Sequence, residues 1–154
     1  MIKRSKSLTN RVSAIRLFID KLVRRAYLGT IQDKLSLLSG TDDSALTSDS
    51  DKQLRQWFIT LSRDQQKYVE QIIEMTAYSA IFQTLTVIDG VAGTLIAGQN
   101  THLSLSLQLY PDDESWHKRS PSVSYELNPA DGSVDELHIH FFAAVKKALN
   151  KKTL

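Results

Sequence analysis

Two histidines and three carboxylates form the only cluster in the sequence whose side chains could bind a metal ion or transfer protons. His138 and His140 are two positions apart, Asp135 and Glu136 precede them, and Asp89 lies earlier in the chain. On a helix, residues two apart point about 200° away from each other, so both imidazoles cannot face one ion. On a strand they would share a face. The helix is favoured below, so we interpret the pair as a surface or interfacial one and predict neither a metal site nor a cofactor.

Asp89 and Glu136 could also act as an acid and a base. Asp89 follows a long apolar stretch and precedes Gly90, so its carboxylate could be exposed near Glu136. Paired carboxylates do this work where their surroundings favour opposite protonation states. More often, an aspartate before a glycine caps or turns the chain, because glycine accepts a positive φ. The sequence holds no nucleophile elbow, phosphate loop or dinucleotide fingerprint, and we assign no catalytic residue.

Charge is distributed unevenly along the chain. Residues 1–30 carry eight basic side chains and one acidic one, Asp20, of the chain's 19 basic and 17 acidic residues. The remaining 124 residues have eleven basic and sixteen acidic side chains, a formal balance of −5. Such a basic segment indicates a contact surface for nucleic acid, an acidic protein or an anionic membrane, or else a solvated helix face. The candidate partner-binding residues are Arg16, Lys21, Arg24 and Arg25.

Trp116 marks a second candidate contact. It lies among charged residues between Pro111 and Pro121, as a partly buried anchor or as an interface hot spot. The sequence favours neither interpretation. The loop that contains Trp116, the stretch 41–51 and the polar face of residues 102–108 could together form a polar binding face.

The composition is that of a globular protein: 154 residues, 42% hydrophobic side chains and no cysteine. The absence of cysteine excludes disulfides and thiolate metal sites and fits a reducing compartment. No stretch approaches the roughly 20 apolar residues of a membrane span. The basic start lacks the apolar run and the cleavage site of a secretion signal. We therefore expect a cytoplasmic bacterial protein without a membrane span.

Apolar spacing predicts helices in the first half of the chain. Hydrophobic residues recur at three- and four-residue steps over 8–38, with an end or kink at Gly29 and a stop at Gly40. Residues 41–51 are small, polar and acidic, which predicts a mobile loop. A short helix over 54–61 precedes a capping box at 62–65, and the helix after it extends to about Ile88. The β-branched residues of 81–88 also suit a strand. The side chains expected on one face of this helix are Val69, Ile72, Ile73, Thr76, Ala80, Thr84 and Val87.

After Gly93 the apolar period changes to two, which predicts strands over 94–96, 103–110 and 123–127, with a turn at 98–100. Ser133 to Glu136 matches a second capping box, so we place the start of a final helix there. The fold class is therefore α+β, with a helical N-terminal half, a small antiparallel sheet of two or three strands and a closing C-terminal helix.

We expect a single domain over 1–154. Its parts are a basic helical head at 1–40, the mobile loop at 41–51 and an α+β body at 52–150. Two or three strands are not stable alone, so the sheet must lie against the helices or pair with another chain, as in a homodimer.

Two short segments resemble a group of small, mostly uncharacterised bacterial proteins. In this chain they are Ile81 to Val91, which ends in an "IDG" turn, and Asp135 to His138, a "DELH"-type helix start. The resemblance covers residues 57–142, and some proteins of the group look like immunity proteins, which bind and silence a toxin. It carries over no catalytic residue. It implies a joint role, as a structural lock or a functional cluster, for Asp89, Gly90, Glu136, Leu137 and His138.

Three hypotheses about function follow. The leading one is a small non-enzymatic protein-binding module of the immunity or antitoxin kind, which binds and neutralises a partner. The alternative is nucleic-acid binding through the basic residues between Lys3 and Arg25. The second alternative is a small metal- or carboxylate-dependent hydrolase centred on Asp89, Glu136 and His138.

Overall fold

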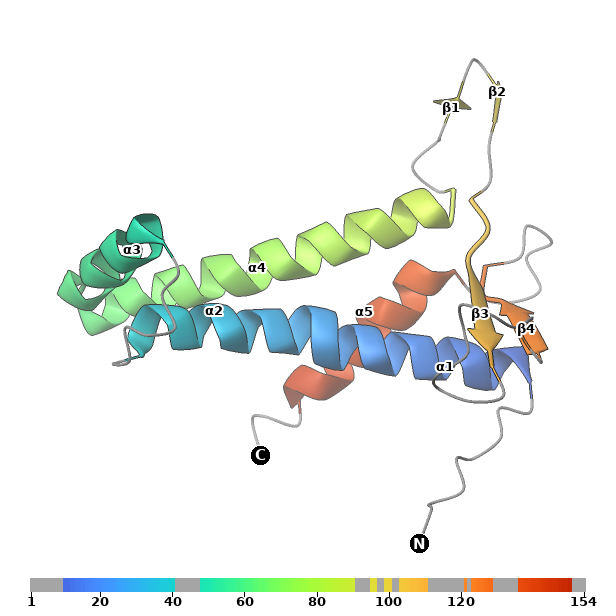
Figure 1. Ribbon diagram of the computed structural model, residues 1–154, viewed down its shortest axis with the longest axis horizontal. Coiled ribbons are helices and arrows are strands. Elements are labelled where there is room, and N and C mark those ends of the chain that lie inside the picture. Colours follow the sequence, from blue (N-terminus) through green and yellow to red (C-terminus); the bar gives the residue numbers. More distant parts are fainter. Residues whose placement is uncertain are drawn as a thin grey trace, which may run out of the picture. The chain divides into compact units, whose positions relative to one another are not determined.

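The computed structural model describes residues 10–40, 48–90, 95–96, 99–100, 103–110, 121, 123–128 and 136–150. Over these residues the protein is α+β, as the sequence predicts (Figure 1). The elements are α1 (Arg11–Lys21), η1 (Leu22–Gly29), α2 (Thr30–Ser39), α3 (Asp49–Thr60), α4 (Arg63–Ile88), β1 (Leu95–Ile96), β2 (Gln99–Asn100), β3 (Ser106–Leu109), β4 (Val123–Glu126) and α5 (Leu137–Asn150).

The chain forms two compact units, each described by itself below. The first unit is Met1–Lys21 with Phe82–Leu154, and the second is Leu22–Ile81. The single domain with a head, a loop and a body stays a prediction.

The backbone is helical without interruption from Arg11 to Ser39. The side chain of Asn10 begins α1, because its Oδ1 accepts a hydrogen bond of 2.9 Å from the Ser13 amide. Of the end or kink predicted at Gly29, the end is wrong, because η1 is a π-helix and α-helical geometry follows it directly, while the kink stays a prediction. A Cβ on Gly29 would lie 3.3 Å from the Arg24 carbonyl oxygen, so only glycine leaves this approach uncrowded.

Gly40 ends α2, as predicted, but for a different reason from the one the sequence suggests. Its backbone is extended rather than left-handed, and its amide donates to the Ser36 carbonyl oxygen at 2.9 Å. A Cβ at this position would lie 2.6 Å from the same oxygen, so close approach requires the glycine. The buried Arg55 of α3 donates from Nε to the Leu37 carbonyl oxygen at 2.7 Å, which satisfies another carbonyl at this helix end.

The second unit has its own apolar core, in which α2 packs on α3. The buried hydrophobic residues of this unit are Val23, Tyr27, Ile31, Leu38 and Phe58.

α3 begins inside the segment predicted to be a loop. Ser48 Oγ accepts a hydrogen bond from the Asp51 amide at 3.1 Å and donates to the Asp51 carboxylate at 2.8 Å. Ser48 is therefore the N-cap residue of α3, a signal that the composition of the stretch obscured. The loop prediction is therefore wrong for 49–51, and residues 41–47 lie outside the described residues.

α4 is helical to Ile88, which decides the helix-or-strand question for 81–88. The capping box at its start is confirmed: the Ser62 amide donates to Gln65 Oε1 at 2.8 Å, and the Gln65 amide donates to Ser62 Oγ at 3.3 Å. After Asp89, Gly90 takes a φ of 75°, in the left-handed region that favours glycine. The predicted face is largely wrong, because most of that set is exposed, namely Ile72, Thr76, Ala80, Thr84 and Val87.

The first unit holds two short antiparallel pairs. β1 pairs with β2, so Gln99 and Asn100 form a strand and not the predicted turn, while Gly98 lies outside the described residues. β3 pairs with β4 from Ser106 opposite Glu126 to Leu109 opposite Val123. The predicted strand over 103–110 is thus shorter than expected, with Leu103 to Leu105 outside β3. A homodimer through the sheet stays a prediction.

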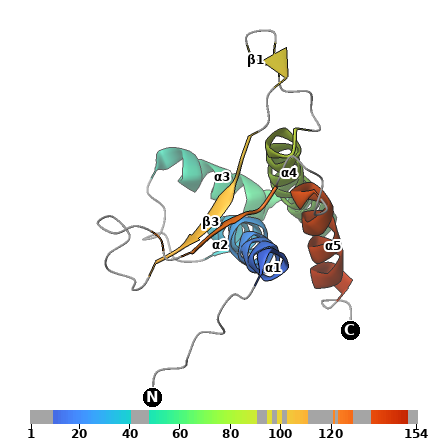
Figure 2. The same ribbon diagram turned by 90° about the vertical axis from the view of Figure 1, so that its right-hand side faces the viewer.

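Helices α1 and α5 lie side by side in the first unit, and β4 lies against α1 (Figures 1 and 2). Every third or fourth residue of both helices points into this core, which the apolar spacing predicts. The buried hydrophobic residues of this unit are Ala14, Ile15, Ile19, Leu85, Leu127, Leu137, Phe141 and Val145. Within the part of the chain that the structure describes, no helix has the length and hydropathy to cross a membrane.

Candidate functional site

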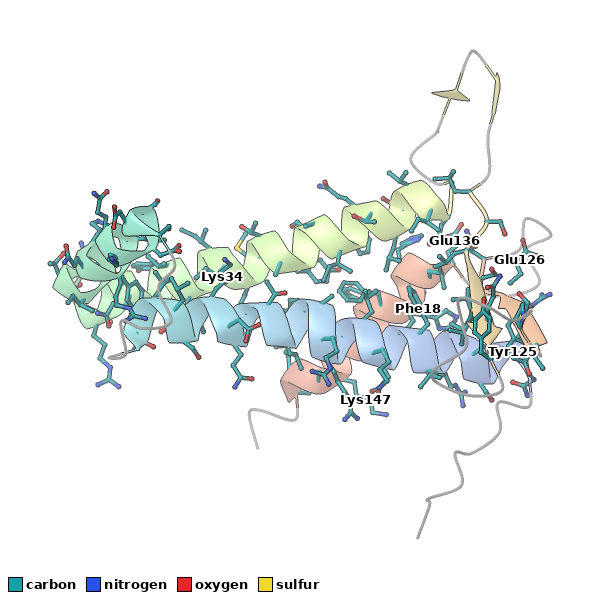
Figure 3. All side chains as sticks on the ribbon, in the orientation of Figure 1. Phe18, Lys34, Tyr125, Glu126, Glu136 and Lys147 are labelled. Carbon is teal, nitrogen blue, oxygen red and sulfur yellow. The ribbon has the colours of Figure 1, made fainter. Side chains whose placement is uncertain are left out.

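The start of α5 brings together three of the residues that the sequence singles out. Glu136 stands just before the helix (Figure 3), and its carbonyl oxygen accepts the first helical hydrogen bonds, from Ile139 at 3.0 Å and His140 at 3.3 Å. Glu136 is therefore the N-cap residue and precedes the helix, so the predicted capping box, which needs it inside the first turn, is wrong. Residues 131–135 lie outside the described residues.

Asp89 caps α5 from a distance of 49 residues in the sequence. Its Oδ2 accepts a hydrogen bond of 2.9 Å from the His138 amide and another of 2.9 Å from the His138 ring Nδ1. A carboxylate at this position satisfies an orphan amide and lies at the positive end of the helix dipole.

The Asp89 carboxylate is almost completely enclosed, with 1% of its side chain exposed. Its second oxygen, Oδ1, is buried and accepts no hydrogen bond from any described residue. Burying a charge without full pairing costs free energy, so such an atom calls for an explanation.

His138 is held on three sides. Asp89 fixes its Nδ1, and the ring of Phe82 meets it edge-to-face at 5.3 Å between centroids. Its Nε2 lies 3.6 Å from Oε2 of Glu136, whose side chain is 48% exposed. The arrangement orients one imidazole and presents one of its nitrogens toward a solvated carboxylate.

Asn128 joins the neighbouring segments by hydrogen bonds and was not predicted from the sequence as a site residue. This buried amide donates from Nδ2 to the Ile88 carbonyl at 2.9 Å and the Leu103 carbonyl at 2.6 Å, and Oδ1 accepts from the Leu105 amide at 2.7 Å. It therefore joins the end of α4 to the segment that leads into β3. Nothing local in the sequence could have revealed partners 23 to 40 positions away.

The structure describes some of the other residues that the sequence singles out, and the rest lie outside the described residues. The four basic residues are exposed, and His140 is partly buried on α5. Trp116 and the loops at 41–47 and 111–120 lie outside the described residues. The exposed basic residues are Arg16, Lys21, Arg24 and Arg25.

A surface that the sequence did not predict lies on α4. Tyr68, Ile72 and Met75 are 64%, 61% and 68% exposed, and their spacing of four and three places them on one helix face. We call these three residues the α4 row. The sequence shows an apolar series along this helix, which includes Ile72. Because Ile72 was expected on the covered face, the sequence did not predict an exposed row.

Two tyrosines of the second unit have altered acidity. Burial raises the pKa of Tyr27 above its ordinary value of 10.0, and Glu74 and Tyr78 raise it further. Burial also raises the pKa of Tyr78, whose ring meets that of Tyr27 edge-to-face with centroids 6.5 Å apart. These groups belong to the packing of η1 on α4 and form no site.

The described residues contain no group of three or more histidine and carboxylate side chains placed to hold one metal ion. Comparison with protein-family models, curated proteins and solved structures finds no match for this chain.

Proposed function

We propose that this chain is a non-enzymatic protein-binding module and that the α4 row contacts its partner. The observation that carries the proposal is the exposure of three large apolar side chains on a single helix face. Contiguous exposed apolar surface on a globular protein marks an interaction site more often than isolated apolar residues do. Tyrosine and methionine are also enriched at interfaces.

The surroundings of the row indicate the chemistry of the partner. The exposed neighbours Gln71, Thr76 and Ser79 carry no charge, whereas Lys67 beside Tyr68 and Asp64 one turn before it are exposed and charged. An interface core is depleted of charge, so the centre of the row matches an apolar surface, with charges at its N-terminal end. α3 of the same unit adds exposed Leu54, Trp57 and Ile59, which are candidates for further anchors.

The resemblance to immunity-like proteins extends the proposal to neutralisation of a partner by binding. The exposed Arg16, Lys21, Arg24 and Arg25 support this extension, because basic side chains outside an apolar contact accelerate encounter with an acidic partner. They also support the nucleic-acid alternative, which the experiment below separates from the first.

The test is site-specific photo-crosslinking in a lysate of the native host. A photoreactive amino acid replaces Met75 in one variant and Lys34, an exposed residue of α2 in the same unit, in the control. We expect one protein to crosslink from position 75 and not from position 34. The adduct should survive nuclease treatment and moderate salt, and Ile72→Glu in the same chain should abolish it.

Equal adducts from both positions would contradict a specific role for the row. Nucleic acid recovered with the chain and lost with nuclease or salt would replace the proposal with the nucleic-acid alternative.

A further inference from the structure

Helix α5 carries apolar side chains on two sides, and the core of the first unit uses only one of them. Leu137, Phe141 and Val145 are buried in that core. On the other side of the helix, Ile139 and Phe142 are 48% and 52% exposed. Their spacing of three makes them neighbours on the helix surface, so α5 exposes a contiguous apolar pair that its own core does not need.

The exposed side of α5 is also basic. Exposed Ala143 and Lys146 continue the line of the apolar pair at helical spacing, and Lys147 beside them is exposed as well. Residues 137–154 hold four lysines and no acidic residue. The surface therefore combines apolar side chains with positive charge. We call the following four residues the outer face of α5: Ile139, Phe142, Ala143 and Lys146.

The neighbouring helix of the same unit exposes a similar combination. α1 packs beside α5 (Figures 1 and 2). Arg16 and Lys21 of α1 are exposed, together with Val12 and Leu17, and Asp20 is the only acid of this helix. Both helices thus add positive charge to this unit, which favours an anionic partner.

The mixture of side chains distinguishes between the anionic partners. Lysine is depleted in protein–protein interfaces, so Lys146 between apolar residues is not typical of one. Nucleic-acid phosphates attract lysine but offer an isoleucine no apolar surface. A bilayer surface accommodates both, because apolar side chains enter the boundary between headgroups and acyl chains while lysines extend to the phosphates.

We propose that the outer face of α5 binds the surface of an anionic lipid bilayer. α5 lies along the plane of the bilayer, with Ile139 and Phe142 inserted among the headgroups and Lys146 and Lys147 on the lipid phosphates. An apolar area of this size is a weak anchor, so the attachment is reversible and depends on the charge of the lipid.

The test is a fluorescence titration of the full chain with lipid vesicles. The chain has no cysteine, so Ala143→Cys accepts a single environment-sensitive dye within the outer face. Lys34→Cys, at an exposed position of α2, is the labelled control. The vesicles are phosphatidylcholine alone, or phosphatidylcholine in which phosphatidylglycerol replaces about a third of the lipid. We expect a blue shift at position 143 with the anionic vesicles only, and none at position 34.

Substitutions on the outer face should weaken vesicle binding by each of its two components. Lys146→Gln combined with Lys147→Gln should weaken it about 25-fold, because each lysine near an anionic surface contributes about fivefold. Phe142→Ala should weaken it more than about fivefold, because the ring no longer leaves water. Trp57→Ala, which removes an exposed aromatic side chain from α3, is the matched control and should bind as the parent chain does.

Absence of a shift at position 143 would overturn the proposal. So would equal shifts at positions 143 and 34, or equal binding to neutral and anionic vesicles. The same shift on adding DNA or polyglutamate without lipid would assign the outer face to nucleic acid or to an acidic protein instead. None of these outcomes depends on whether the α4 row contacts a partner.

Discussion

Helices α4 and α5 differ in what they do with their apolar residues. α5 has 14 residues and buries Leu137, Phe141 and Val145, at a spacing of four. α4 has 26 residues, and Leu85 is its only fully buried one. The shorter helix contributes to the core of its unit, whereas much of the longer helix exposes the apolar side chains that a core would use. The comparison shows that apolar periodicity finds a helix without showing which of its faces is covered.

The two helices also differ in which residues cap their first amides. α4 begins with a local capping box, in which Ser62 and Gln65 satisfy each other's amides. α5 begins with a buried carboxylate supplied from the far end of another helix. The start of α5 is therefore sensitive to tertiary structure, and the start of α4 is not.

The largest effect should come from truncating a core side chain of α5. Phe141→Ala should lower the free energy of unfolding by about 3–5 kcal/mol, because it leaves a cavity where the ring is fully buried. Met75→Ala in the α4 row should change it by less than about 0.5 kcal/mol. Urea denaturation followed by circular dichroism measures both. Phe142→Ala, one position along and exposed, is the control, and similar losses from Phe141 and Met75 would remove the distinction between the helices.

A smaller effect should follow from removing the distant cap. Asp89→Ala should cost about 1–2 kcal/mol, because the His138 amide loses its acceptor. Hydrogen exchange at that amide should accelerate as well. Asp64→Ala, in the exposed first turn of α4, should cost less than about 0.5 kcal/mol. Unchanged protection of the His138 amide in Asp89→Ala would show that the cap is dispensable.

The smallest effect concerns the tyrosines of the second unit. The raised pKa of Tyr27 means that the folded chain holds this proton more tightly than the unfolded chain, whose pKa is 10.0. The folded state therefore loses stability as pH rises from about 10 through the folded-state pKa. At lower pH, Tyr27 is protonated in both states and adds nothing to the pH dependence of stability. Denaturation across this alkaline range should show a shallower decline for Tyr27→Phe. An identical decline in the wild type and in Tyr27→Phe would show that other groups cause it.

Local signals explain what the sequence predicted well. The α+β class, the helix over 63–88 and its capping box depend on residues three or four positions apart, and the structure confirms them. The alternation around β3 is confirmed over 104–108, with Leu105 and Leu107 half-buried and Ser106 exposed, but Leu103 is exposed and Tyr110 is half-buried. Such patterns need no knowledge of the tertiary structure.

Two of the errors arose where a local pattern is compatible with more than one structure. Ser133 to Glu136 has the residue types of a capping box, yet α5 starts after Glu136 and takes its cap from Asp89. Glycine often ends a helix, yet at Gly29 only the π-helical geometry ends, and α2 follows without a break. In both cases the residue types permit the predicted structure without requiring it.

The residues of the candidate site also divide into those that the sequence predicted and those that it did not. Asp89, Glu136 and His138 were named from the sequence, and the structure places His138 in contact with both carboxylates. Asn128 was not named, because its partners are backbone atoms whose approach no residue pattern records. The α4 row was missed because exposure depends on what the rest of the chain leaves uncovered.

The long-range cap has a consequence for the order in which the chain folds. A ribosome completes α4 and the Asp89 that follows it well before α5 is synthesised, so the acceptor is ready when the His138 amide emerges. A synthetic peptide of residues 136–150 lacks that acceptor, and isolated helices of this length are marginal in water. α5 therefore acquires a stable beginning only by docking, which makes the closure of its first turn a late event in folding.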